Sequence, residues 1–379
     1  MPATAPIRAG LDPSALEGAA RDLGPRSITF VVDGEPVTYR CDGRSFDTDA
    51  APDGDTVVSM ASEAWEDFAG QLRSFINLHL SGQLGFDRGG FSDLADWDPA
   101  LRLLHAAIPI YDPARADLGG FDPAEAVTLD HDDEELRARL AALGYLHVRG
   151  VFSPEEMDAA DAEVDRLAAM ARPGDDESWW VTDEAGRKVL CRLVYATLRS
   201  ELLARLERDP RVHRLGTLLS DEHRVAPDRM EGSAVLIKQP GRTEGLSNIP
   251  WHQDCGMGGH AIFCPNVSVG IQLTGSNAGT GNLRVVPGSH GQTLHHLWER
   301  RFQDAPVVAI DTEPGDVTVH VADVMHESPR PTGDGGRRTM YVTHYPPALW
   351  DHIGPGQAFN DLVRSRTEEV ARLQGPRPA

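Results

Sequence analysis

Hydrophobic and polar positions near the N-terminus alternate as they do in short strands and then as they do in helices. Two β-rich runs, SITFVV and VTYR, flank the turn residues DGEP, which predicts a β-hairpin. The run TVVSM precedes a helical pattern through Trp65, Phe68 and Leu72, and WDPALRLLHAAI is amphipathic. A short sheet followed by helices predicts a small α+β domain over residues 1–115.

Residues 111–133 interrupt this pattern. The segment is rich in Pro, Gly and Asp and has no apolar periodicity, as expected of a linker. A second domain, residues 125–379, is predicted to follow. It begins with a helix over Asp133–Leu143 and a strand in GYLHVRG, and Ser153 and Glu156 then form the capping box of another helix.

The pattern of hydrophobic and polar residues changes again from Ala234 onward. Short β-rich runs separated by Gly, Pro and Asn follow one another: AVLIK, VSVGIQL, NLRVV, VVAI, DVTVHV and TMYVTHY. Short strands at such spacing predict an antiparallel sandwich or barrel. The expected fold class is therefore α+β, with helices packed around a β core.

Composition and charge exclude several functions. The chain has 379 residues, of which 40% are hydrophobic and 25% charged, as in an ordinary globular protein. No stretch reaches the ~20 apolar residues that span a bilayer, and no signal-peptide pattern opens the chain, so we expect a cytoplasmic protein. The net charge of −22 argues against nucleic acid as a partner. Four cysteines in so long a chain do not predict a disulfide scaffold.

A metal site is predicted in the segment Trp251-His252-Gln253-Asp254. On a strand, His252 and Asp254 project from the same face, one offering an imidazole nitrogen and the other a carboxylate oxygen. His326 is the best third ligand from another strand, with His320 as its backup. Two histidines and one carboxylate on one face of an octahedral iron leave positions for a bidentate co-substrate and O2.

An arginine after His326 suits the co-substrate 2-oxoglutarate, whose distal carboxylate needs a buried cationic partner. Arg337 and Arg338 both qualify. Strand alternation favours Arg338, which shares a face with Met340 and Val342, although the choice stays open. Ser328 could donate a second hydrogen bond to the same carboxylate.

These motifs together resemble the phytanoyl-CoA dioxygenase family. The resemblance rests on WHQD, GNLRVVPGSH, the GDVTVH segment with HES after it, and the following arginine, and it runs from about Asp133 to Pro347. It implies a double-stranded β-helix core with iron(II), 2-oxoglutarate and O2 as cofactors. It assigns the iron to His252, Asp254 and His326 and the co-substrate to Arg338.

The same resemblance implies roles for two more residues and a reaction. Gln253 and Lys238 would lie beside the co-substrate. The expected activity is hydroxylation of an unactivated C–H bond in a hydrophobic small molecule, such as a lipid-like, terpenoid or secondary-metabolite compound. Halogenating relatives lack the aspartate, so Asp254 argues against halogenation. The loop before the arginine departs from the family pattern, which is a further reason why Arg337 stays a candidate.

Two other interpretations remain. The residues His252, Cys255, His260 and Cys264 approach zinc-knuckle spacing, which would make the protein a non-catalytic metal-binding or lipid-carrying module. Residues 15–110 weakly resemble a sterol carrier protein-like domain through their hairpin and the helices after it. That resemblance implies an apolar ligand tunnel or a substrate-presenting module, and a purely structural appendage is equally compatible. The oligomeric state is not indicated by the sequence.

Overall fold

The structure is a computed structural model that describes residues 7–48, 51–183, 185–225, 233–239, 248–254, 266–293 and 305–347. The chain forms two compact units, of which the first contains the chain up to Ala116. Residues 291–293 also belong to the first unit, where Thr293 forms a β-bridge with Ile110. Domain limits at residues 115 and 125 therefore stay a prediction.

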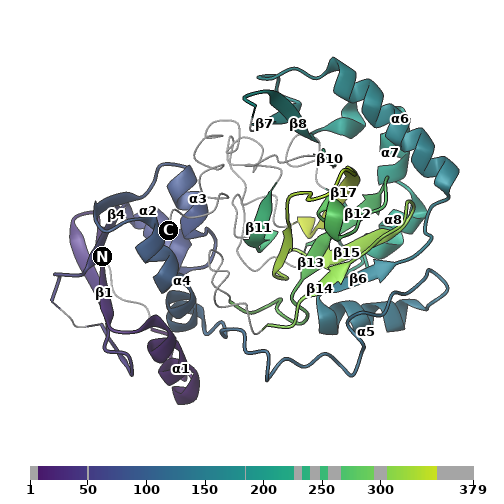
Figure 1. Cartoon of the computed structure of the whole chain (residues 1–379). Coiled ribbons are helices and arrows are strands. Elements are labelled where there is room, and N and C mark those ends of the chain that lie inside the picture. Colours follow the sequence, from purple (N-terminus) through teal and green to yellow (C-terminus); the bar gives the residue numbers. More distant parts are fainter. Residues whose placement is uncertain are drawn as a thin grey trace. The chain divides into compact units, whose positions relative to one another are not determined.

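The first unit combines a mixed sheet with helices, as the sequence predicts (Figure 1). Its strands, in the spatial order β3-β2-β1-β4-β5, are β1 (Arg26–Val32), β2 (Glu35–Cys41), β3 (Phe46–Asp47), β4 (Thr56–Met60) and β5 (Gly85–Arg88). Its helices are α1 (Pro13–Leu23), α2 (Ser62–Ala69), α3 (Phe75–Leu80) and α4 (Phe91–Ala106).

The predicted hairpin forms between β1 and β2. Val32 lies opposite Glu35, so the loop consists of Asp33 and Gly34 alone, with φ angles of 49° and 91°. Two positive φ angles match the twist of the flanking strands, which explains the Asp-Gly pair. The helical pattern predicted through Leu72 is wrong at its end: α2 stops at Ala69, and Leu72 is 40% exposed.

The second unit contains two antiparallel sheets and four α-helices among the described residues. The larger sheet has the order β6-β15-β12-β17-β10-β8-β7, and β9 pairs with the end of β17; the smaller has the order β11-β16-β13-β14. The larger sheet's strands are β6 (Tyr145–Val148), β7 (Ser178–Thr182), β8 (Lys188–Leu193), β9 (Arg224–Val225), β10 (Ala234–Lys238), β12 (Val267–Gln272), β15 (Val317–Val321) and β17 (Arg337–Tyr345). The smaller sheet's strands are β11 (Ile249–His252), β13 (Leu283–Val285), β14 (Val308–Ile310) and β16 (His326–Ser328). The helices are α5 (Asp133–Leu143), α6 (Pro154–Met170), α7 (Glu201–Glu207) and α8 (Pro210–Gly216), with short 3-10 turns η1 (Ala196–Leu198) and η4 (Ala278–Thr280).

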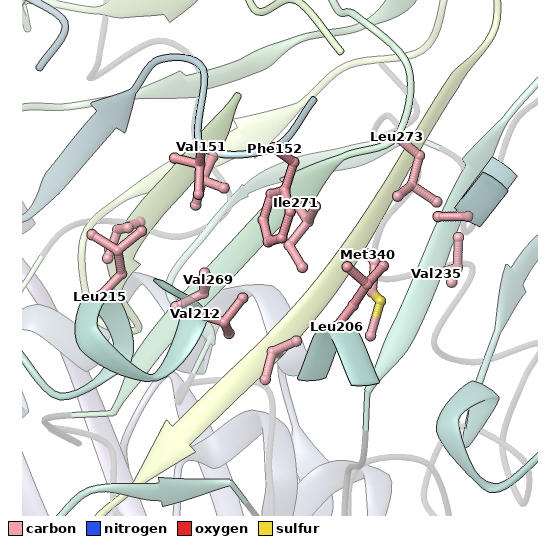
Figure 2. Packing of buried hydrophobic residues seen from close by; sticks show 14 of the residues in the cluster. Val151, Phe152, Leu206, Val212, Leu215, Val235, Val269, Ile271, Leu273 and Met340 are labelled. Atoms are coloured by element: carbon pink, nitrogen blue, oxygen red, sulfur yellow. The ribbon is translucent and has the colours of Figure 1, made fainter. Parts of the chain in front are cut away.

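The two faces of the larger sheet differ in chemistry because side chains alternate along each strand. The outer face is apolar and packs against α5, α6, α7 and α8 (Figure 1). Figure 2 shows part of this core, in which Leu206, Val212 and Leu215 of the helices meet Val269, Ile271 and Met340 of the strands. Burial of such side chains contributes about 1.5–3 kcal/mol each, so this face anchors the sheet.

The inner face of the same sheet is polar yet buried. It carries Lys238 on β10, Arg337 and Thr339 on β17, Gln272 on β12, and Thr318 and His320 on β15. Buried polar side chains persist where they hydrogen-bond one another or serve a ligand. The inner face of the larger sheet is therefore the candidate location of a ligand-binding site.

One local expectation needs correction, and one strand boundary was not anticipated. The run DVTVHV forms β15, which ends at Val321 in the larger sheet, and His326 starts a separate strand, β16, in the smaller one. Asp254 lies just beyond β11, which ends at His252, and so is not on the strand. In the part of the chain that the structure describes, no helix combines the length and apolar character needed to cross a membrane.

Candidate metal centre and anion pocket

Three predicted ligands come together at the edge of the smaller sheet. Donor atoms of His252, Asp254 and His326 all lie within 4.8 Å of one another. His252 at the end of β11 lies opposite His326 at the start of β16, and their ring centroids are 4.2 Å apart. Asp254 reaches the same point from the turn after β11 rather than by strand alternation. His326 is buried, whereas His252 and Asp254 are half-buried.

Backbone carbonyls orient both imidazoles. Nδ1 of His252 lies 2.8 Å from the carbonyl oxygen of Pro250, and Nδ1 of His326 lies 2.9 Å from that of Val324. Carbonyl oxygens only accept, so each Nδ1 carries the proton and donates it. In the neutral form of each ring, Nε2 then keeps the lone pair that a metal requires. Two neutral imidazoles and a carboxylate fit iron(II) with part of its coordination sphere open.

Arg337 is the buried cation beside this centre. Its side chain is 1% exposed and points to the inner face, where Nη1 donates to the hydroxyl of Ser328 at 2.9 Å and the carbonyl of Gly281 at 3.0 Å. Nη2 donates to the hydroxyl of Tyr341, and Nε to that of Thr339, both at 3.0 Å. All four acceptors are neutral. Within the described residues no carboxylate forms an ion pair with Arg337.

Arg338, which the sequence favoured, has different surroundings. Arg338 lies on the outer face of β17, where it forms ion pairs with Asp161 at 2.9 Å and Asp165 at 2.7 Å on α6. The alternation argument placed Arg338 with Met340 and Val342 correctly. That face, however, packs against helices, whereas Ser328 lies on the same side as Arg337.

Lys238 adds a second buried basic side chain. It lies opposite Arg337 in the β10–β17 ladder, and its Nζ donates to the carbonyl oxygens of Ser328 and Pro329, each at 2.5 Å. Burial, together with the positive charge of Arg337, holds the pKa of Lys238 well below its usual range. An anion between these two side chains would offset both effects.

Gln253 and His320 occupy buried positions near the ligands. Gln253 Nε2 donates to the carbonyl of Asp323, which ties the turn after β11 to the one before β16. His320 is 2% exposed, with its ring centroid 4.6 Å from that of His326 and 6.3 Å from that of Tyr341. His320 therefore packs beside the metal group and is not one of its three members, as expected.

Sequence reasoning missed Tyr341 and Gly270. A Cβ at Gly270 would lie 2.9 Å from the ring of Tyr341 and 2.7 Å from the hydroxyl of Thr318, so glycine makes room for both on the inner face. The only available signal was a glycine in the middle of VSVGIQL. Three members of the zinc alternative, Cys255, His260 and Cys264, lie outside the described residues; the fourth, His252, belongs to the metal group above.

A double-stranded β-helix that gathers two histidines and an aspartate defines a class, the mononuclear non-haem iron enzymes. The family model for phytanoyl-CoA dioxygenase (PhyH) matches residues 141–339, just over half of the chain. The chain therefore belongs to this family, and it is a 2-oxoglutarate-dependent oxygenase that uses iron(II) and O2. The predicted fold class and family are confirmed. Enzymes of this family act on small molecules.

Individual solved structures resemble the chain only at low sequence identity. No curated protein matches the chain. The non-haem α-ketoglutarate-dependent epimerase SnoN from nogalamycin biosynthesis is 24% identical and has a TM-score of 0.46, covering 56% of this chain and 80% of its own. EctD from S. alaskensis with bound Fe is 20% identical with a TM-score of 0.48, covering 64% and 84%. The carbocyclase SnoK from nogalamycin biosynthesis is 20% identical with a TM-score of 0.45, covering 62% and 96%.

Proposed function

We propose that this oxygenase hydroxylates a hydrophobic small molecule at an unactivated C–H bond, with release of succinate and CO2. When bound, iron(II) would activate O2, which is the oxidant, and 2-oxoglutarate would supply two of the electrons that the reduction of O2 requires. The protein's part is to hold the metal on one face, to anchor the co-substrate and to exclude water. The convergence of His252, Asp254 and His326 is the observation that supports the proposal.

The distal carboxylate of 2-oxoglutarate is assigned to the anion pocket formed by Arg337, Lys238 and Ser328. A guanidinium that is 1% exposed with only neutral acceptors is costly unless a ligand brings the counter-charge. Arg337 presents a planar fork, and Ser328 lies two residues after the ligand His326. This spacing suits a molecule that chelates the metal at one end and carries a carboxylate at the other.

The substrate proposal rests on charge. A net charge of −22 disfavours polyanionic substrates, acyl-CoA esters among them. A neutral, mainly apolar molecule of lipid-like, terpenoid or secondary-metabolite type meets no such repulsion. Screening such compounds for stimulation of succinate formation tests this part directly. A panel in which only anionic thioesters stimulate turnover would contradict it.

Anaerobic titration tests the metal and co-substrate sites without knowledge of the substrate. Iron(II) and 2-oxoglutarate added together should give the visible charge-transfer band of the chelate. We expect His252→Ala, Asp254→Ala and His326→Ala each to abolish the band. A full band in any of the three variants would remove that residue from the ligand set.

The two neighbouring arginines provide a matched pair of variants. Arg337→Ala should weaken 2-oxoglutarate binding about 10- to 100-fold, because a charge-assisted hydrogen bond is worth roughly 1.5–3 kcal/mol. Arg338→Ala removes ion pairs to α6 and should leave 2-oxoglutarate binding near the wild-type value. The reverse ranking, read from the same charge-transfer titration, would return the role to Arg338.

A further inference from the structure

The face of the smaller sheet opposite the metal ligands carries a second cluster of side chains. Trp251 precedes His252, Glu327 follows His326, and Arg284 lies directly opposite Glu327 on β13. Neighbouring residues in a strand point to opposite faces, so these three side chains lie behind the ligands. We call Trp251, Arg284 and Glu327 the outer clamp.

Two contacts join the clamp across three strands. Arg284 forms a short ion pair with Glu327, and its guanidinium carbon lies 5.6 Å from the ring centroid of Trp251. A guanidinium at this distance from an indole is attracted to the face of the ring. The Glu327 side chain is 8% exposed and the Arg284 side chain 39%, so water screens the pair only in part. Arg284 thus reaches from β13 across β16 to β11.

The strand that most needs such support is β11. It is four residues long, and it meets β16 at Ile249 and His252 with an irregular register between them. A regular ladder fixes a strand through closely spaced backbone hydrogen bonds, which this pairing provides only in part. Side-chain contacts must therefore do more to hold His252, and Asp254 just after it, at the correct distance from His326.

We propose that Arg284 is a positioning residue that holds the two strands bearing His252 and His326 in register for iron. The inference rests on the proposed metal site. The direction of the change in iron(II) affinity distinguishes this role from a purely electrostatic one. Loss of a positive charge near a bound cation would by itself strengthen iron(II) binding. Loss of a positioning contact would weaken it instead.

The experiment uses the full chain and anaerobic iron(II) titration, with the chelate band in saturating 2-oxoglutarate as a second readout. Arg284→Met should weaken iron(II) binding about 10-fold and shift the band, the scale typical of residues that orient metal ligands. Arg284→Lys keeps the charge but loses the planar group, so a smaller, several-fold loss is expected. If the methionine variant does not fold, the iron(II) affinity of the lysine variant tests the proposal.

Arg211 supplies a matched control. Its guanidinium lies 4.0 Å from the ring centroid of Phe152, and it pairs with Glu156 at 2.7 Å, so it has the same kinds of partner as Arg284 away from the metal group. Arg211→Met should lower the melting temperature of the metal-free protein but leave iron(II) affinity within about twofold.

The outcomes separate failure of the proposal for Arg284 from failure of the proposed metal site. Iron(II) binding as tight as wild type or tighter in Arg284→Met overturns the inference, as does an equal loss in Arg211→Met. A wild-type protein that binds no iron(II) would instead refute the proposed metal site, on which the clamp depends.

Discussion

Gly270 lies on the inner face of β12, where the ring of Tyr341 and the hydroxyl of Thr318 occupy the space of a side chain. Tyr341 accepts a hydrogen bond from Arg337. We expect Gly270→Ala to push Tyr341 aside, disturb Arg337 and weaken 2-oxoglutarate binding roughly 3- to 10-fold, about the worth of one hydrogen bond. The charge-transfer titration measures this change.

Gly18 on α1 is the matched control, because nothing lies within 4 Å of a Cβ placed there. Gly18→Ala should leave 2-oxoglutarate binding unaltered and stabilise the protein by up to about 1 kcal/mol, since alanine favours helices. Equal 2-oxoglutarate affinity in wild type and Gly270→Ala would show that Tyr341 does not support Arg337.

At this residue scale, the sequence is informative where chemistry is local. The grouping of His252, Asp254 and His326 could be predicted because few residue types bind iron and their order along the chain is specific. The choice between Arg337 and Arg338 depended on which face of β17 is lined by helices. Alternation separates the two faces of a strand but does not say which one faces the metal group, so the sequence alone could not decide between the two arginines.

At the scale of elements, α6 shows how a local signal fixes a boundary. Ser153 accepts a hydrogen bond from the backbone N–H of Glu156, whose carboxylate accepts one from the N–H of Ser153. Ser153→Ala should lower the free energy of unfolding by about 1 kcal/mol, whereas Ser153→Thr should retain most of it. Urea unfolding followed by circular dichroism measures both, and an unchanged midpoint in the alanine variant would contradict the cap.

Element boundaries were predictable wherever such caps or tight turns occur. The capping box of α6 and the Asp33-Gly34 hairpin were found correctly for this reason. The break between β15 and β16 was not, because three of the four intervening residues are apolar; Ala322, Val324 and Met325 are all fully buried. Only the pairing of β15 with β12 and of β16 with β11 and β13 separates the two strands, and pairing is a long-range property.

On the scale of the whole molecule, each compact unit contains a histidine held neutral by burial. In the first, His105 lies among the rings of Tyr39, Trp65 and Phe68, and its Nε2 shares a hydrogen bond of 2.9 Å with the Tyr39 hydroxyl. Burial lowers the pKa of His105 to about 4. In the second, burial and the nearby His213 and His223 lower the pKa of His344 to about 4. The sequence did not reveal either environment, since only packing decides whether a histidine is dry.

The lowered pKa values of these two histidines make the stability of the folded protein depend on pH. An unfolded histidine titrates near pH 6.5, so between pH 6.5 and 4 the unfolded chain binds a proton that the folded chain does not. The contribution of each histidine to the free energy of unfolding is therefore present above pH 6.5 and is lost as the pH falls toward 4. At pH 5 the loss is about 2 kcal/mol per histidine. Urea unfolding at pH 7 and pH 5 measures the decline. His105→Leu should be less stable than wild type at pH 7, because the Tyr39 hydroxyl loses its hydrogen-bond partner, yet its stability should fall less on acidification. If its decline equals that of wild type, His105 is not the titrating group, and the acid sensitivity must come from His344 or from the carboxylates.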